Sequence, residues 1–273
     1  MSEAEVYAQT ARSTVNRLKQ RGHYDHDTVH GIIDTAPVLH VSFNPTSFDD
    51  DPFPTILPML GCTGSFTHVG SEEKAATAIY LHGHSASRFM KLPINPPSYL
   101  EDASLPGVPV CVAATHIDGL VLAYTPFNHS CNYRSAVIHG YANAVEDPAE
   151  KMYALQLITD NIVPDRWDNS RVPPTEAEMK STAVIRVDIV SASAKIRAYG
   201  VGNDKMDLDD QEMRRRVWTG VIPMALTYGE PKPAEENLIE GVPDYIAGWT
   251  KRQNEESARY ARDIISLKAP KKV

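Results

Sequence analysis

Hydrophobic residues near the amino terminus recur at helical spacing. The pattern predicts an amphipathic helix over residues 3–21, with five residues sharing one side: Ala4, Ala8, Ala11, Val15 and Leu18. A second, shorter helix is predicted to begin near Asp27, a residue type that caps helices well. It must end before Pro37, because proline forces extended geometry on the residue before it.

Beyond Pro37 the pattern changes to the alternation of strands. Strands are predicted over residues 38–43, 55–60, 78–82, 135–145 and 183–197. A hairpin is predicted between residues 110–117 and 120–124, because Asp118-Gly119 is a two-residue loop that accepts positive φ without steric cost. Gly140 lies inside a predicted strand, which indicates a bulge or the close approach of another group.

Two further helices are marked by their first turns. Asp147, Pro148 and Glu150 are typical of a capped helix start, and the helix is predicted to run to about Ile162. Thr175 and Glu178 begin a shorter helix. Because successive strands outnumber helices and do not alternate with them, we expect a mainly β (α+β) fold, a closed or nearly closed antiparallel barrel with peripheral helices.

Composition narrows the classes of function. The 273 residues include 27 Lys and Arg against 35 Asp and Glu, a net charge of −8, and the densest basic run is only Arg214–Arg216. A general nucleic-acid binder would be more basic, so no nucleic-acid partner is expected. Three cysteines, no signal peptide and no apolar span of membrane length predict a cytoplasmic protein without membrane contact.

One segment carries the residue types of a phosphate site. His82, Gly83, His84, Ser87 and Arg88 follow a predicted strand, and Lys91 comes three residues later. Hydroxyls, two cations and a glycine that permits close approach suit a phosphate monoester. The alternative is a polar loop that leads into an ordinarily capped helix.

Three other features allow more than one interpretation. Asn132-Tyr133-Arg134-Ser135 places convergent polar groups at a strand entry, which suits a planar polar ligand or simply an edge strand. Trp218 beside a glycine could flank a flat ring or pack in the core. His26 and His30 share a helix face at metal-ligand spacing, but no Glu follows His26 as in an HExxH motif, so a solvated helix start is the preferred interpretation.

Together these segments resemble the flavin-binding split-barrel superfamily, which contains pyridoxamine 5'-phosphate oxidases and nitroimidazole-resistance reductases. The chain is most similar to its pyridoxamine-phosphate-oxidase-like, flavin-nucleotide-binding branch, over about residues 20–225. The residues that carry the resemblance are 54–58, 79–85, 87–88, 132–135, 193–197 and 217–223.

This resemblance implies a six-stranded antiparallel split β-barrel that binds FMN. It also implies a homodimer with the cofactor site at the subunit interface. In this organisation residues 1–36 are an N-terminal helical extension and residues 37–225 the flavin-binding domain. Residues 226–273 are a C-terminal extension that packs on the barrel or on the dimer partner.

The resemblance also implies a set of site residues. Leu57 and Pro58 would pass the isoalloxazine ring, and Ser87, Arg88 and Lys91 would grip the phosphate. The full cofactor-binding set is Leu57, Pro58, His82, Gly83, Ser87, Arg88, Lys91, Tyr133, Arg134, Ser135, Lys195 and Trp218. His82 and His84 are the candidates for catalytic proton transfer, because imidazole titrates near neutral pH.

The implied activity is that of an FMN-dependent oxidoreductase, an oxidase or a reductase. Hydride would pass between flavin N5 and a small amine or imine, nitro or heterocyclic substrate, with NADH or NADPH as candidate reductant. The C-terminal arginine-rich segment of true pyridoxamine-phosphate oxidases is missing, so the vitamin substrate is not implied. Two alternatives remain: a flavin-binding module without turnover, or a haem-binding or haem-degrading protein with His82, His84 or His139 as iron ligand.

Overall fold

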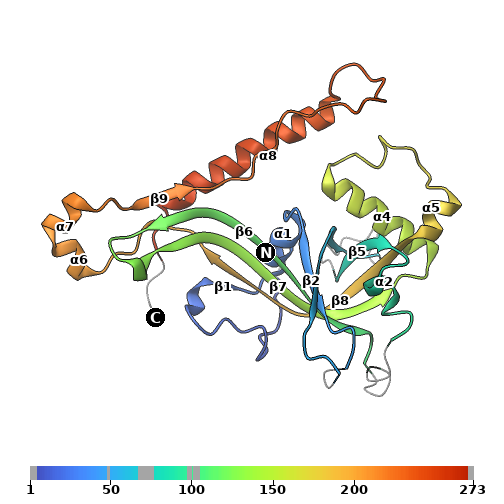
Figure 1. The fold of residues 1–273 in the computed structure, drawn as a ribbon, viewed down its shortest axis with the longest axis horizontal. Helices are drawn as coiled ribbons and strands as arrows, with labels where there is room; N and C mark the ends of the chain where they lie inside the picture. The colour runs from blue at the N-terminus through green and yellow to red at the C-terminus, as the bar shows by residue number, and fades with distance from the viewer. Residues whose placement is uncertain (1–4, 48–49, 67–76, 97–99, 101–104, 270–273) are drawn as a thin grey trace. The chain divides into compact units, whose positions relative to one another are not determined.

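The computed structural model describes residues 5–47, 50–66, 77–96, 100 and 105–269. Figure 1 shows its strands and helices in chain order. The strands are β1 (Gly22–His23), β2 (Leu39–Phe43), β3 (Thr55–Met59), β4 (Gly61–Gly64), β5 (Ala78–His84), β6 (Val108–Leu122), β7 (Ser130–Ala144), β8 (Thr182–Arg197) and β9 (Gly220–Pro223). The α-helices are α1 (His26–Asp34), α2 (Arg88–Lys91), α4 (Pro148–Ile162), α5 (Glu176–Ser181), α6 (Lys205–Asp209), α7 (Gln211–Arg216) and α8 (Asp244–Asp263), with short 3-10 helices at Lys19–Arg21, Pro126–Asn128 and Ile264–Ser266.

The strands form one sheet in the order β3-β2-β6-β7-β8-β5-β4, with β1 added to β8 and β9 added to β6. The pairs β2/β3, β2/β6, β4/β5, β5/β8 and β6/β9 are antiparallel. The strands at the two ends of this order, β3 and β4, are separated in the chain by Leu60 alone. The mainly β, antiparallel prediction is confirmed and is consistent with a split barrel. The predicted count of six strands is not confirmed, since the described residues form nine strands in an open order.

The chain divides into two compact units. The first comprises residues 1–15, 23–115 and 135–194, and the second comprises residues 16–22, 116–134 and 195–273. The long strands β6, β7 and β8 each contribute residues to both units. The predicted three-part division at residues 36 and 225 stays a prediction.

The core of the first unit lies between α4 and the strands β4 and β5 (Figure 1). Tyr80 of β5 is 1% exposed and packs with Cys62, Ala154 and Ile158. The helix begins as predicted, because Asp147 accepts a hydrogen bond from the Ala149 amide at 2.9 Å. This packing fixes β5, which leads directly into the predicted phosphate segment.

Glu150 has a different role from the predicted one. Its carboxylate does not close a capping box but accepts hydrogen bonds from the Tyr80 hydroxyl at 2.9 Å and from Arg186 Nη1 at 3.0 Å. Burial explains the difference, since a nearly buried carboxylate needs strong donors that the helix start does not supply. The capping box of α5 is present as predicted, with Thr175 and Glu178 bonded reciprocally.

The predicted hairpin at Asp118-Gly119 is wrong, because β6 continues through both residues. Asp118 is 4% exposed and accepts two hydrogen bonds from Arg134 of β7, so its carboxylate is satisfied without a turn. Gly119 lies against β9, where an added Cβ would come within 3.0 Å of the Ile222 carbonyl oxygen. Asp118 and Gly119 therefore form contacts with the neighbouring strands β7 and β9 instead of a turn.

The predicted amino-terminal helix is also wrong for residues 5–18, while residues 3 and 4 lie outside the described residues. Thr10 and Ser13 hydrogen-bond each other's side chains and backbone in a turn, which competes with helix formation. Leu18 has φ 58°, a left-handed conformation that an α-helix does not accommodate. The second helix, α1, forms as predicted, but its N-cap is Asp25, which accepts from the Thr28 amide at 2.8 Å.

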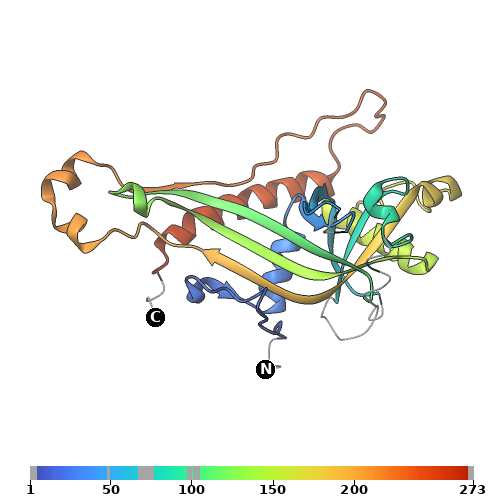
Figure 2. The same cartoon turned by 60° about the horizontal axis from the view of Figure 1, so that its bottom comes forward.

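The second unit contains a long helix that the sequence did not reveal. Helix α8, visible in Figure 2, is joined to the preceding segment by Asn254, whose side chain bonds the Tyr228 amide and carbonyl at 2.7 and 2.9 Å. Arg197 is buried and donates to the carbonyl oxygens of Tyr199 and Gly200 at 3.1 and 3.0 Å. Among the described residues, no helix combines the length and the apolar character needed to cross a membrane.

Candidate functional site

The predicted phosphate segment forms a tight corner between β5 and α2. The Ser87 amide donates to the His84 carbonyl oxygen at 2.9 Å, and the Lys91 amide donates to the Ser87 carbonyl oxygen at 3.2 Å. Phe89 and Met90 are 0% and 1% exposed, and the Phe89 ring stacks on that of Phe43 at 4.6 Å. Two buried anchors inside a four-residue helix therefore hold this corner in place.

The polar side chains of the corner point away from those anchors. Ser87, Arg88 and Lys91 are all exposed. Arg88 Nη2 donates to Thr55 Oγ1 at 3.2 Å, which joins the corner to the start of β3. Ser87 makes no side-chain capping bond to α2. Among the described residues neither Arg88 nor Lys91 forms an ion pair, so both cations remain without a counter-charge.

The two predicted catalytic histidines differ in their surroundings. His84 is exposed, and its Nδ1 accepts a hydrogen bond from the Ala86 amide at 3.1 Å. His82 is half-buried, and its Nδ1 is buried without a hydrogen-bond partner in the part of the chain that the structure describes. Burial lowers the pKa of His82, which favours its neutral form.

Gly83 separates these histidines and lets α2 pack closely. A Cβ at this position would lie 2.8 Å from Met90 Cε. On the neighbouring strand β3, Leu57 pairs with Val41 and Pro58 with His40. The exposed Arg88 donates a hydrogen bond to this same strand at Thr55, which joins α2 to β3.

Four predicted cofactor residues belong to the second unit: Tyr133, Arg134, Lys195 and Trp218. Within that unit Arg134 donates two hydrogen bonds to Asp118. Its guanidinium carbon also lies 4.2 Å from the centroid of the Tyr260 ring, a cation–π contact. Trp218 is 65% exposed and contacts Gly220. Ser135 is half-buried and belongs to the first unit.

Sequence reasoning missed two features of the first unit. Thr55 accepts a hydrogen bond from Arg88, although the sequence indicates it only as part of residues 54–58. A cavity lined by Arg12 and His139 was missed entirely, since no local pattern connects residues 127 positions apart. For the predicted metal alternative at His26 and His30, the described residues hold no group of three or more metal-ligating side chains, and His30 Nε2 is hydrogen-bonded to the Tyr7 hydroxyl at 2.5 Å.

Comparison with known proteins identifies the family. A family model described as pyridoxamine 5'-phosphate oxidase matches residues 25–196. The structure of the flavocytochrome Anf3 from Azotobacter vinelandii is similar, with a TM-score of 0.68 and 28% identity over 89% of this chain and 98% of that one. The FAD and heme binding protein from Mycobacterium smegmatis is similar in fold, with a TM-score of 0.64 and 24% identity over 84% and 97% of the two chains. A search of curated proteins finds no match. Since the matched stretch contains all of the corner between β5 and α2, we conclude that this chain belongs to the pyridoxamine 5'-phosphate oxidase family.

Proposed function

We propose that this protein binds a flavin nucleotide and uses it as an oxidoreductase on a small substrate. The observation that carries the proposal is the corner of Ser87, Arg88 and Lys91, whose two cations form no ion pair with any described residue. An acidic chain of net charge −8 gains nothing for its fold from two such cations side by side, whereas a phosphate would neutralise them.

The fit of the corner rests on its rigidity as well as its charge. The buried side chains of Phe89 and Met90 hold the backbone of the corner in place. Less conformational entropy is therefore lost when Arg88 and Lys91 bind a phosphate. The Ser87 hydroxyl, which is not spent on capping, adds a donor. We propose FMN for this site, with FAD as the alternative, because the similar protein from Mycobacterium smegmatis is a FAD and heme binding protein.

A bound flavin would supply hydride and electron transfer at its ring system. In this proposal Arg88 and Lys91 bind the phosphate, and β3 orients the ring through the backbone near Leu57 and Pro58. Neutral His82, whose Nδ1 lacks a partner among the described residues, is the group that can hold or release a proton. The proposal extends to a homodimer that completes the site, and to NADH or NADPH as reductant.

Titration with FMN and FAD, followed by flavin fluorescence, tests the site. The variant Arg88→Gln with Lys91→Gln should weaken binding about tenfold or more, because two charge-assisted contacts are lost. The matched control is Arg215→Gln with Arg216→Gln, an exposed basic pair at the end of α7 that should leave affinity unchanged. Equal flavin affinity in the two double variants would show that the corner is not the phosphate site. Anaerobic reduction by NADH or NADPH then separates an enzyme from a carrier.

Haem binding is a second candidate, favoured by the likeness to a flavocytochrome over 89% of this chain. His82 is the ligand we propose, since burial keeps its ring neutral and its Nδ1 has no hydrogen-bond partner among the described residues. A Soret band that reconstitutes with haemin and is lost in His82→Ala supports this candidate. Absence of that band after reconstitution rejects it.

A further inference from the structure

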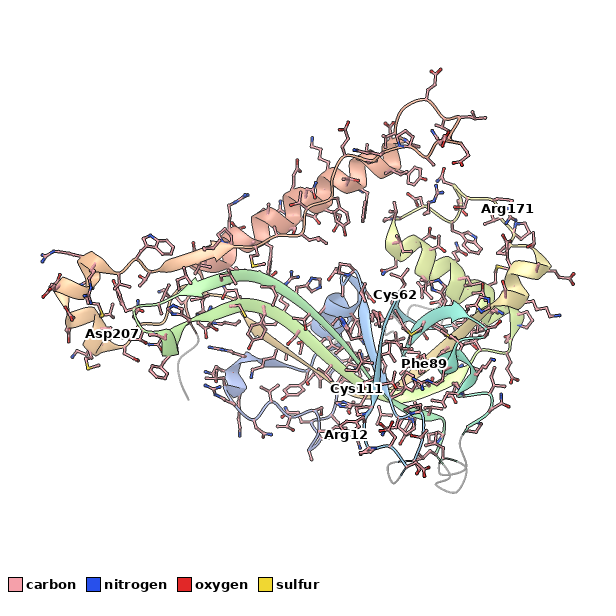
Figure 3. All side chains as sticks on the ribbon, viewed as in Figure 1. Arg12, Cys62, Phe89, Cys111, Arg171 and Asp207 are labelled. Carbon is pink, nitrogen blue, oxygen red and sulfur yellow. The ribbon has the colours of Figure 1, made fainter. Side chains whose placement is uncertain are left out.

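The cavity lined by Arg12 and His139 lies in the first unit and has a volume of about 250 Å³. Its walls come from β2, β6, β7 and the segment around Arg12, and no residue of the predicted flavin set lines it. Cys111 of β6 lies on this wall, opposite Ser42 of β2 in the strand register. Figure 3 labels Arg12 and Cys111 on the ribbon. The cavity therefore has a different lining from the predicted flavin set, although Phe43, which borders it, also stacks on Phe89 of the corner.

The polar part of the cavity is positively charged. Arg12 is exposed at its rim and forms no ion pair among the described residues. His139 lies beside it, with a buried Nδ1 that finds no hydrogen-bond partner within the described part of the chain. The described residues of the lining include no carboxylate.

The rest of the lining combines three polar residues, Ser42, Asn44 and Tyr141, with an apolar part. Pro54, Val110 and Val190 border the same space as Arg12 and His139. The volume lies below the ~300 Å³ at which pockets for drug-sized ligands begin, so the occupant must be small. A planar guanidinium matches a carboxylate in a two-point geometry. A phosphate dianion would call for more than this single permanent cation.

We propose that this cavity binds a small monocarboxylate with an apolar body. Arg12 pairs with the carboxylate, the His139 ring borders the site, and the apolar body lies against Val110 and Val190. The proposal does not depend on flavin binding. It gives the chain a second small-molecule site.

Protection of Cys111 from alkylation tests the proposal on the full-length protein. Benzoate serves as probe, benzamide as its neutral counterpart, and iodoacetamide as the thiol reagent, with each cysteine peptide quantified by mass spectrometry. Benzoate should slow modification of Cys111 about threefold or more at saturation, because it fills the space beside the thiol. Cys131, which belongs to the second unit, is the internal reference and should keep its rate.

Two variants assign the protection to the charged wall. Arg12→Gln should abolish protection by benzoate, and His139→Phe should weaken it. Arg17→Gln, an exposed arginine outside the cavity, should behave like the unmodified chain. Since Arg12 is exposed, its variant should fold, and its melting temperature verifies this.

Several results would overturn the proposal. They are equal protection by benzamide, unchanged protection in Arg12→Gln, protection by inorganic phosphate but not by benzoate, and no protection by benzoate at about 10 mM. Saturation-transfer NMR of benzoate on the same variants provides a readout that does not depend on the reactivity of Cys111. A signal that is absent, or that persists in Arg12→Gln, rejects the site as well.

Discussion

Arg134 and Asp118 form a two-point ion pair within the second unit. Arg134 Nε lies 3.0 Å from Asp118 Oδ2, and Nη2 lies 2.8 Å from Oδ1. The Asp118 side chain is 6% exposed and that of Arg134 is 26% exposed, so water screens the pair only weakly. The pair joins the adjacent strands β6 and β7. The sequence predicts a hairpin turn at Asp118, inside β6.

Removing one partner of this pair should destabilise the protein strongly. Asp118→Ala leaves Arg134 half-buried without its counter-ion, and we expect a loss of about 2–4 kcal/mol in the free energy of unfolding. Urea unfolding with matched slopes measures it. Adding Arg134→Leu to Asp118→Ala should restore part of the loss, since the unpaired charge is then gone.

The control for this cycle is an exposed pair in the same unit. Lys251 and Glu255 lie on α8 with 4.0 Å between Nζ and Oε1, and their side chains are 78% and 62% exposed. Glu255→Ala should change stability by less than about 0.5 kcal/mol. If Asp118→Ala costs no more than Glu255→Ala, the ion pair does not stabilise the fold as described.

Gly140 should not tolerate a side chain. A Cβ at Gly140 would lie 2.3 Å from the Asp188 carbonyl oxygen, a backbone atom that cannot move aside easily, which confirms the close approach predicted from the sequence. Gly140→Ala is expected to cost about 2 kcal/mol or more in the free energy of unfolding. Gly31→Ala is the matched change, because nothing lies within 4 Å of its Cβ position in α1. It should instead stabilise the protein by about 0.5–1 kcal/mol.

Equal effects of the two glycine substitutions on the denaturant midpoint would contradict this assignment. A loss confined to Gly140→Ala would show that the β7 to β8 approach limits the sequence at this position.

Local features could be predicted from the sequence because their energetics are local. Thr175 and Glu178 bond each other within one turn, so the capping box is visible in four residues. Asp118-Gly119 misled the same reasoning, since its partners are Arg134 on β7 and Ile222 on β9, both distant in the chain. A turn motif states what the backbone can do, and tertiary contacts decide whether it does so.

The candidate site divides in the same way. The segment of Ser87, Arg88 and Lys91 was recognisable because its cations are close together in the sequence. The pairing of Arg88 with Thr55 was not, because it depends on how β3 and β5 lie in the sheet. Nothing in the sequence could join Arg12 to His139, since the cavity that they line arises only from strand packing.

Cys62 should resist alkylation as long as the first unit stays folded. Its side chain is 2% exposed, and burial, together with the negative charge of Asp34, raises the pKa of its thiol to about 12. The reactive thiolate is therefore scarce at neutral pH, and we expect modification about 100-fold slower than for a free cysteine. Half-buried Cys131 is the comparison within the same chain. Reaction of both at one rate, measured by mass spectrometry without denaturant, would show that Cys62 is accessible.

The stability of the fold should decrease between about pH 6.5 and pH 4 in part through His30. Burial, followed by the charge of His26, lowers the pKa of His30 to about 4, and the Tyr7 hydroxyl lies 2.5 Å from its Nε2. The unfolded chain, with a higher pKa for this histidine, binds more protons in that window, so acid favours unfolding. We expect a contribution on the order of 1 kcal/mol, because the ring is only half-buried. Urea unfolding across this pH window measures the contribution. The variant His30→Gln, which does not titrate, should show a shallower pH dependence of stability, while the variant of the exposed His84, His84→Gln, should not. Equal slopes in the unmodified protein and both variants would exclude His30 as the source.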